Sequence, residues 1–151
     1  MRKRCYICPR VRHCRLPERA VREFILIKGF TKMSSFLYVF IGGGAGAVVR
    51  YGIGLLTQQW AERFPIATFL SNAGACLILG WVMATAARGE MDDRMRLLLA
   101  TGFCGGFSTF STFTAESWQL WHRGDTAALL VNLLFHPAVC WICFLAGFRG
   151  L

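Results

Sequence analysis

Residues 102–116 read GFCGGFSTFSTFTAE, and this stretch decides the fold. It lies in a long apolar run, but its paired glycines and successive hydroxyl residues favour a break over a continuous helix. Within a membrane, non-helical backbone is tolerated only where it is buried in protein or lines a cavity. A break also releases carbonyl oxygens that can hold a cation and amide groups that can meet an anion. The sequence therefore predicts a broken membrane helix with available backbone groups.

Two phenylalanines follow the predicted break. Phe110 and Phe113 are three positions apart and so share a helix face, while Thr109, Phe113 and Glu116 fall on a neighbouring face. The edge of an aromatic ring carries partial positive charge, so two edge-on rings can accompany a small anion. The alternative is ordinary core packing. The serines and threonines interleaved with these rings favour the ion path.

Four hydrophobic stretches extend outward from this motif, at residues 35–57, 66–87, 95–118 and 125–148. Each is near the length of about 20 residues that spans a bilayer as a helix. Hydrophobic residues make up 55% of the chain and charged residues 17%, against about 25% charged in a typical soluble domain. We therefore expect an all-α, multi-pass membrane protein with four transmembrane helices, the third of them broken.

The positive charge is concentrated at the N-terminus. Residues 1–32 hold ten Lys or Arg against two Glu, a net +8, whereas residues 33–151 hold seven Arg against six acidic residues, a net +1. The overall charge of +9 is therefore no sign of a nucleic-acid partner. We expect residues 33–151 to form one four-helix membrane domain. Residues 1–32 are expected to be a basic extension that is disordered or mis-annotated, with translation starting at Met33; a targeting segment is the alternative.

Arg50 lies well inside the first hydrophobic stretch. An ionisable residue at that depth is functional or paired by default. Gly42, Gly46 and Arg50 are four residues apart and share one helix face, and small residues at that spacing let helices approach closely. The alternative interpretation is a packing face that ends in an arginine reaching toward the interface.

Asn72 is a polar side chain within the second hydrophobic stretch. Its amide offers two donors without a net charge, which could replace water around an anion without trapping it. A hydrogen bond between helices explains Asn72 equally well.

Several of these motifs together resemble the Fluc fluoride channels, also called CrcB. The stretch from Gly43 to Tyr51 is similar to that family's Gly-Gly-x-x-Gly-Ala-x-x-Arg-Tyr motif, with one shift in glycine spacing. Asn72 follows a Pro65…Thr68 lead-in, and residues 102–116 are close to the family signature GFCGGxTTFSTFxxE. The resemblance covers residues 33–148, and the last motif is highly specific.

The resemblance implies an antiparallel, dual-topology homodimer in the bacterial inner membrane, with two fluoride pores and a central structural Na⁺. The pore would be lined by Asn72, Phe110, Phe113, Thr109, Thr112 and Glu116. The backbone carbonyls of Gly105 and Ser108 from both subunits would hold the sodium ion. Arg50 and Gly46 would be structural or vestibule residues.

Lysine and arginine in short loops orient a membrane protein. From Met33 onward, the side that holds the termini has four arginines and the opposite side has two: Arg88, Arg94, Arg96 and Arg149 against Arg63 and Arg123. This weak bias is compatible with insertion in both orientations.

The fourth stretch departs from the family pattern. The family's tyrosine falls on Asn132, its small polar residue on His136 and its later serine on Cys140. Pro137 removes a helical hydrogen bond in mid-span, and a histidine there could titrate. His136 either makes a neutral hydrogen bond across the dimer or lines the pore and makes conduction sensitive to pH.

The resulting hypothesis is a passive channel that lets cytoplasmic fluoride leave the cell and reduces its toxicity; no enzyme activity is expected. Neutral HF crosses membranes and dissociates inside, so an anion-selective exit is sufficient. One rival is a small multidrug exporter, which would need a membrane-embedded acid that residues 35–57 lack. The other is a non-transporting adaptor that works through residues 1–32.

Overall fold

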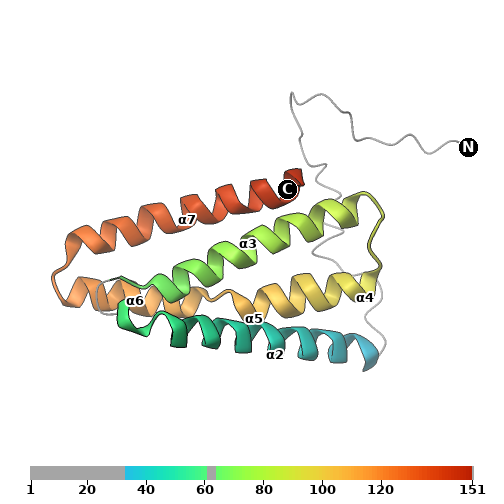
Figure 1. Cartoon of the computed structure of the whole chain (residues 1–151), viewed down its shortest axis with the longest axis horizontal. Coiled ribbons are helices and arrows are strands. Elements are labelled where there is room, and N and C mark those ends of the chain that lie inside the picture. Colours follow the sequence, from blue (N-terminus) through green and yellow to red (C-terminus); the bar gives the residue numbers. More distant parts are fainter. Residues whose placement is uncertain (1–32, 61–63, 151) are drawn as a thin grey trace, which may run out of the picture. The chain divides into compact units, whose positions relative to one another are not determined.

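The computed structural model of the protein describes residues 33–60 and 64–150, so the expectations for residues 1–32 lie outside the described residues. The regular structure in these ranges is helical throughout, which confirms the predicted all-α class there. In chain order the helices are α2 (Met33–Leu56), η1 (Gln58–Trp60), α3 (Ile66–Ala87), α4 (Asp93–Arg96), η2 (Leu97–Cys104), α5 (Gly105–Phe107), α6 (Phe110–His122) and α7 (Thr126–Arg149) (Figure 1).

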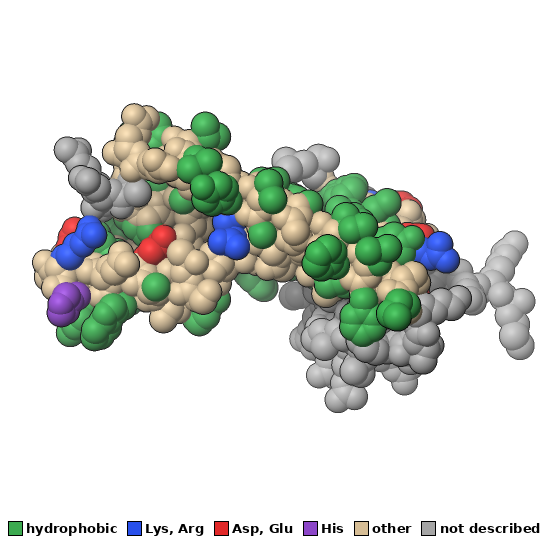
Figure 2. Space-filling view, turned by 90° about the horizontal axis from the view of Figure 1, so that it is seen from below, with side chains coloured by type: hydrophobic (Ala, Val, Ile, Leu, Met, Phe, Trp, Pro, Cys, Tyr) green, Lys and Arg blue, Asp and Glu red, His purple; other side chains and the backbone are tan. Residues whose placement is uncertain are grey.

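Three of these helices are long and apolar enough to cross a bilayer. α2, α3 and α7 have 24, 22 and 24 residues and mean hydropathies of 1.5, 1.7 and 2.0. Large apolar side chains on them face outward, such as Phe40 (78% exposed) and Leu134 (66%). Figure 2 shows hydrophobic side chains spread along the visible face. A soluble protein would bury such residues; the chain is a multi-pass membrane protein.

The remaining predicted stretch, 95–118, is divided among shorter helices. α4, η2 and α5 follow one another without a gap, and α6 begins after two extended residues, Ser108 and Thr109. η2 has the wider winding of a π-helix, which is rare and frequent at functional sites. We call residues 93–122 the interrupted segment.

Two aspartates and two glycines set the ends of these elements. Asp92 accepts a hydrogen bond from the backbone N–H of Met95 (2.8 Å), and Asp125 accepts one from that of Ala128 (3.1 Å). Such caps satisfy amide groups at a helix N-terminus. Gly89 and Gly124 have φ values of 75° and 74°, a conformation that favours glycine and ends α3 and α6.

α2 packs against the interrupted segment through glycines on both sides. Gly42 of α2 lies against Gly102, Gly43 lies against Gly106, and Gly46 lies against the backbone of Phe103 and Phe107. A β-carbon at Gly46 would lie 2.7 Å from the backbone nitrogen of Phe107 and would collide with backbone. The two backbones therefore touch directly, as small residues at this spacing allow in membranes.

A second glycine contact joins α3 to α7. A β-carbon at Gly80 would lie 2.8 Å from the backbone nitrogen of Phe148, and one at Gly147 would lie 3.0 Å from that of Trp81. α3 also contacts η2, and in Figure 1 it runs between the interrupted segment and α7. α3 therefore links the two glycine-packed pairs.

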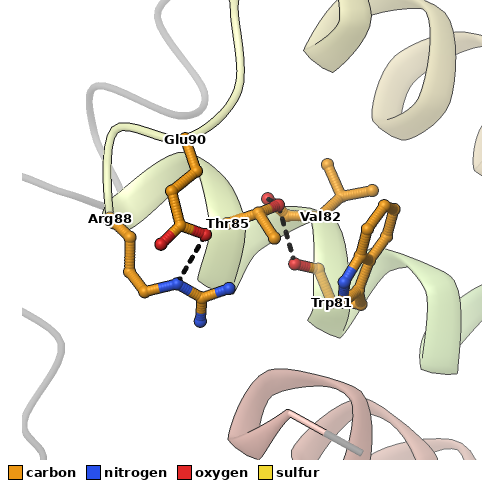
Figure 3. A network of polar contacts seen from close by, with 5 residues as sticks. All are labelled: Trp81, Val82, Thr85, Arg88 and Glu90. Carbon is orange, nitrogen blue, oxygen red and sulfur yellow. Dashed lines mark hydrogen bonds and ion pairs between the residues drawn. The ribbon is translucent and has the colours of Figure 1, made fainter.

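The C-terminal end of α3 carries a small group of polar contacts (Figure 3). The hydroxyl of Thr85 donates within α3 and lies 3.0 Å from the carbonyl oxygens of both Trp81 and Val82. Arg88 Nε lies 2.8 Å from Glu90 Oε2, and both side chains are exposed. Charged groups here fit the point where α3 leaves the hydrocarbon layer.

Adding one methyl group at Gly46 should destabilise the fold, whereas the same change at Gly44 should not. A β-carbon added at Gly44 would meet no atom within 4 Å, while one at Gly46 would abut the backbone of Phe103 and Phe107. Overpacking costs about 1–3 kcal/mol, but alanine in an open helix position gains about 1 kcal/mol over glycine. Thermal unfolding in detergent should show a lower midpoint for Gly46→Ala and an equal or higher one for Gly44→Ala. Equal midpoints for the two variants would contradict the close contact.

Candidate functional site

The interruption consists of two residues with extended backbone. Ser108 has φ −80° and ψ 154°, and Thr109 has φ −152° and ψ 114°. The side chain of Thr109 accepts a hydrogen bond from the backbone N–H of Thr112 (3.2 Å) and so begins α6 as its N-cap. The hydroxyls of Thr109 and Thr112 are also within hydrogen-bond distance (3.0 Å).

The amide of Asn72 closes on both backbone groups of Thr109. The N–H of Thr109 donates to Asn72 Oδ1 (2.7 Å), and Asn72 Nδ2 donates to the carbonyl of Thr109 (3.3 Å). Asn72 is buried on α3, and its Oδ1 replaces the carbonyl that the N–H of Thr109 would meet in a continuous helix, while its Nδ2 gives the Thr109 carbonyl an additional donor. Asn72 therefore contacts the interrupted backbone, and it also has a side-chain partner on another helix.

A chain of buried polar side chains continues from Asn72. Asn72 Nδ2 lies 3.0 Å from His136 Nε2, and His136 Nδ1 lies 3.2 Å from Asn132 Oδ1. Asn132 Nδ2 donates to the hydroxyl of Ser117 (3.0 Å), which donates to the carbonyl of Phe113 (2.7 Å). These bonds join α3, α6 and α7. We call the polar network the side chains of Asn72, His136, Asn132 and Ser117 together with the backbone carbonyl of Phe113.

Both ring nitrogens of His136 therefore lie within hydrogen-bond distance of partners in the same chain. It is 3% exposed and Asn132 is 0% exposed. α7 continues through Pro137 from Thr126 to Arg149, so the proline does not end the helix.

A groove of about 260 Å³ lies beside the interruption. The aromatic pair forms part of its wall: the ring centroids of Phe110 and Phe113 are 5.7 Å apart, and those of Phe113 and His136 are 4.7 Å apart at 77°. Phe110 is 79% exposed, so this wall is open on one side. The lining residues are Asn72, Cys76, Ser108, Thr109, Phe110, Phe113, His136, Pro137 and Cys140.

Glu116 lies apart from the lining of this groove. Thr68 Oγ1 donates to Glu116 Oε1 (2.7 Å). Glu116 Oε2 and the buried hydroxyl of Ser71 have no hydrogen-bond partner among the described residues. Buried polar atoms normally have partners, so these two are available to water or to an ion.

Arg50 donates from Nε to the carbonyl of Gly106 (3.1 Å). From its depth in the first hydrophobic stretch, Arg50 was predicted to be functional or paired. It is half-buried, and its partner is the backbone just before the interruption. It is not among the residues that line the groove.

The interruption also changes the partners of the two carbonyls, those of Gly105 and Ser108, that the family resemblance assigns to a sodium ion. In a continuous helix the carbonyl of Gly105 would accept from the N–H of Thr109, and that of Ser108 from the N–H of Thr112. Here the N–H of Thr109 goes to Asn72, and that of Thr112 goes to the side chain of Thr109. Both carbonyls are thereby released, and Gly105 lies on an exposed face.

Most residues of the groove lining were predicted from the sequence, but the continuity of the polar network was not. Asn72 and His136 were predicted separately without a connection between them, and Ser117 and Thr68 were given no role. One usable signal was present: Asn132, His136 and Cys140 are four residues apart, which places three polar or polarisable groups on one face of α7.

Comparisons with known proteins agree on one family. The sequence profile described as "CrcB-like protein, Camphor Resistance (CrcB)" matches residues 37–148. A protein of Phocaeicola vulgatus is 41% identical over 93 residues, which cover 61% of this chain and 77% of the relative. A protein of Pyrococcus abyssi is 36% identical over 117 residues, covering 77% and 94%. One of Paracoccus denitrificans is 36% identical over 121 residues, covering 78% and 96%. All three relatives are named fluoride-specific ion channel FluC.

Removing the side-chain amide of Asn72 should loosen the interruption. Asn72→Ala leaves the N–H of Thr109 without its acceptor, and an unsatisfied buried donor costs about 1–3 kcal/mol. Hydrogen exchange should therefore become faster at Thr109 and in the first turn of α6. The matched control is Ser71→Ala on the same helix, because the Ser71 hydroxyl has no partner among the described residues. Unchanged exchange in Asn72→Ala would mean that the amide does not hold the interruption.

Proposed function

This chain belongs to the CrcB-like family, and on that premise we propose that it is a fluoride-selective ion channel. The relatives are named as ion channels, so the family also bears out the expectation that the chain is not an enzyme. The single observation that carries the proposal is the groove at the interruption. It brings the amide of Asn72 and the rings of Phe110 and Phe113 to one site.

The chemistry of this groove suits a small anion. Its polar lining consists of amide, hydroxyl, thiol and imidazole groups and includes no carboxylate, lysine or arginine among the described residues, and such groups can replace water around an ion. The edges of the two aromatic rings add partial positive charge. Thr112 and Glu116, further along α6, would continue the polar path, and Cys140 contributes a thiol to the groove wall where the family has a serine.

In this proposal the interrupted segment is the third of four transmembrane passes. Its 30 residues would rise about 45 Å at about 1.5 Å per residue, which exceeds the hydrocarbon thickness of about 30 Å. Irregular backbone at that depth requires partners within the protein, and Asn72 supplies them for Thr109.

The protein is proposed to work as an antiparallel, dual-topology homodimer. Phe110 lines the groove but is 79% exposed, so a second copy could complete the wall. The weak arginine bias between the loops supports insertion in both orientations.

A structural Na⁺ is proposed between the two copies. The carbonyls of Gly105 and Ser108 fit such an ion because the interruption releases both from their helical donors. Two carbonyls from one chain are few ligands for a cation, so the second copy would supply the others. Bound there, the ion would neutralise the convergence of carbonyl dipoles.

Transport is proposed to be passive and outward in the bacterial inner membrane. Acid outside the cell favours HF, which crosses the bilayer and releases fluoride in the cytoplasm. A selective pore then lowers the internal concentration without coupling to another gradient.

Fluoride efflux from proteoliposomes, followed with a fluoride electrode, tests this function. We expect rapid fluoride release and little chloride release. Phe110→Ile and Asn72→Asp should each slow efflux by about tenfold or more, the effect of losing about 1.4 kcal/mol of interaction. Phe135→Ile is the matched control, because Phe135 is 63% exposed and does not line the groove.

Absence of fluoride release, or equal release of chloride, would refute the channel. Normal efflux in both groove variants would refute the assignment of the pore. Deleting residues 1–32 separates the adaptor hypothesis, because a channel formed by residues 33–151 should keep its flux without them.

A further inference from the structure

The polar network has only one arrangement of protons that satisfies all its members. The backbone N–H of Thr109 can only donate, so Asn72 must present Oδ1 to it. Asn72 Nδ2 then faces both the carbonyl of Thr109 and His136 Nε2. Because Nδ2 is a donor, His136 Nε2 must accept, and it therefore carries no proton.

The hydrogen bonds at the Ser117 end of the network lead to the same protonation of His136. The carbonyl of Phe113 can only accept, so the Ser117 hydroxyl donates to it and accepts from Asn132 Nδ2. Asn132 Oδ1 is then the atom that faces His136 Nδ1. The imidazole is thus neutral, with its proton on Nδ1.

From this we propose that His136 is a positioning residue of the channel: as the neutral Nδ1–H tautomer, it fixes the orientation of the Asn72 amide that holds the interruption. The tautomer follows from the hydrogen bonds alone, and only the expected effect on fluoride flux rests on the proposed function. A second proton on Nε2 would face the N–H of Asn72. If Asn72 then turned its oxygen toward His136, its NH₂ would meet the N–H of Thr109.

The surroundings hold the ring in place without a counter-charge. Phe69 and Phe113 pack edge-to-face with the imidazole at centroid distances of 5.3 and 4.7 Å. The other titratable or charged groups on α3, α6 and α7 are Cys76, Glu116, His122, Cys140, Cys143 and Arg149, and of these Cys76 and Cys140 line the groove beside the ring. Glu116 is hydrogen-bonded to Thr68, one turn before Asn72. Among residues 33–60 and 64–150, no carboxylate is recorded within hydrogen-bond distance of His136.

Nitrogen NMR of the full chain labelled with ¹⁵N-histidine tests the tautomer directly. At about neutral pH we expect one histidine with a protonated Nδ1 and an unprotonated Nε2, and the His136→Gln spectrum identifies it by its loss. A proton on Nε2 instead, or protons on both nitrogens, would overturn the proposal. This measurement needs no fluoride flux.

Fluoride efflux of matched variants tests the positioning role. His136→Gln keeps an acceptor for Asn72 and should retain flux within about threefold, while His136→Leu removes it and should lose about tenfold or more. His122→Gln, at an exposed histidine stacked on Trp118, should match the unmodified channel. Equal flux in the Gln and Leu variants would overturn the positioning role.

If His136→Leu fails to fold, the NMR spectrum and the His136→Gln variant still test the proposal. A loss of fluoride flux in a folded His136→Gln variant would also contradict it. Failure of the proposed function is recognised separately, since the unmodified channel would then show no fluoride flux even with the expected spectrum.

Discussion

The double hydrogen bond between Asn72 and the backbone of Thr109 is the contact on which the rest of the site depends. An unsatisfied backbone group in hydrocarbon costs several kcal/mol, so an interruption at membrane depth requires substitute partners. The Asn72 amide provides a donor and an acceptor at once. With that contact made, Ser108 and Thr109 can stay extended, the groove can form beside them, and α6 can begin with its own cap.

The glycine contacts bring the helices close together around the interruption. Gly42 and Gly46 bring α2 against the backbone of η2 and α5, and this approach places Arg50 within reach of the Gly106 carbonyl. α3 packs on α7 by the same means, through Gly80 and Gly147. Side chains of ordinary size at these positions would separate the helices, and Asn72 could not reach both α6 and His136.

The sequence predicted the helices well because hydropathy and glycine spacing are local properties. The stretches at 66–87 and 125–148 nearly match α3 and α7. The groove residues could be predicted from the sequence because the motif around Phe110 is specific. The hydrogen-bond partners of His136 could not be predicted in the same way. Periodicity places His136 on a face of α7 but does not tell which neighbour it contacts, so Asn72 and Asn132 were not foreseen as its partners. The two extended residues of the interruption likewise follow from their contacts, not from composition alone.

The distribution of charge around the groove explains how it could pass an anion without trapping it. Within residues 33–60 and 64–150, the groove lining includes no Asp, Glu, Lys or Arg, and the hydrogen bonds of His136 require a neutral ring. In a medium of low dielectric constant, a fixed cation in the wall would hold a small anion so strongly that it left slowly. Arg50 carries such a charge, but it is directed at the Gly106 carbonyl and does not line the groove. An anion in the groove would therefore meet amides, hydroxyls and ring edges, which are attractive enough to replace water and weak enough to let it pass.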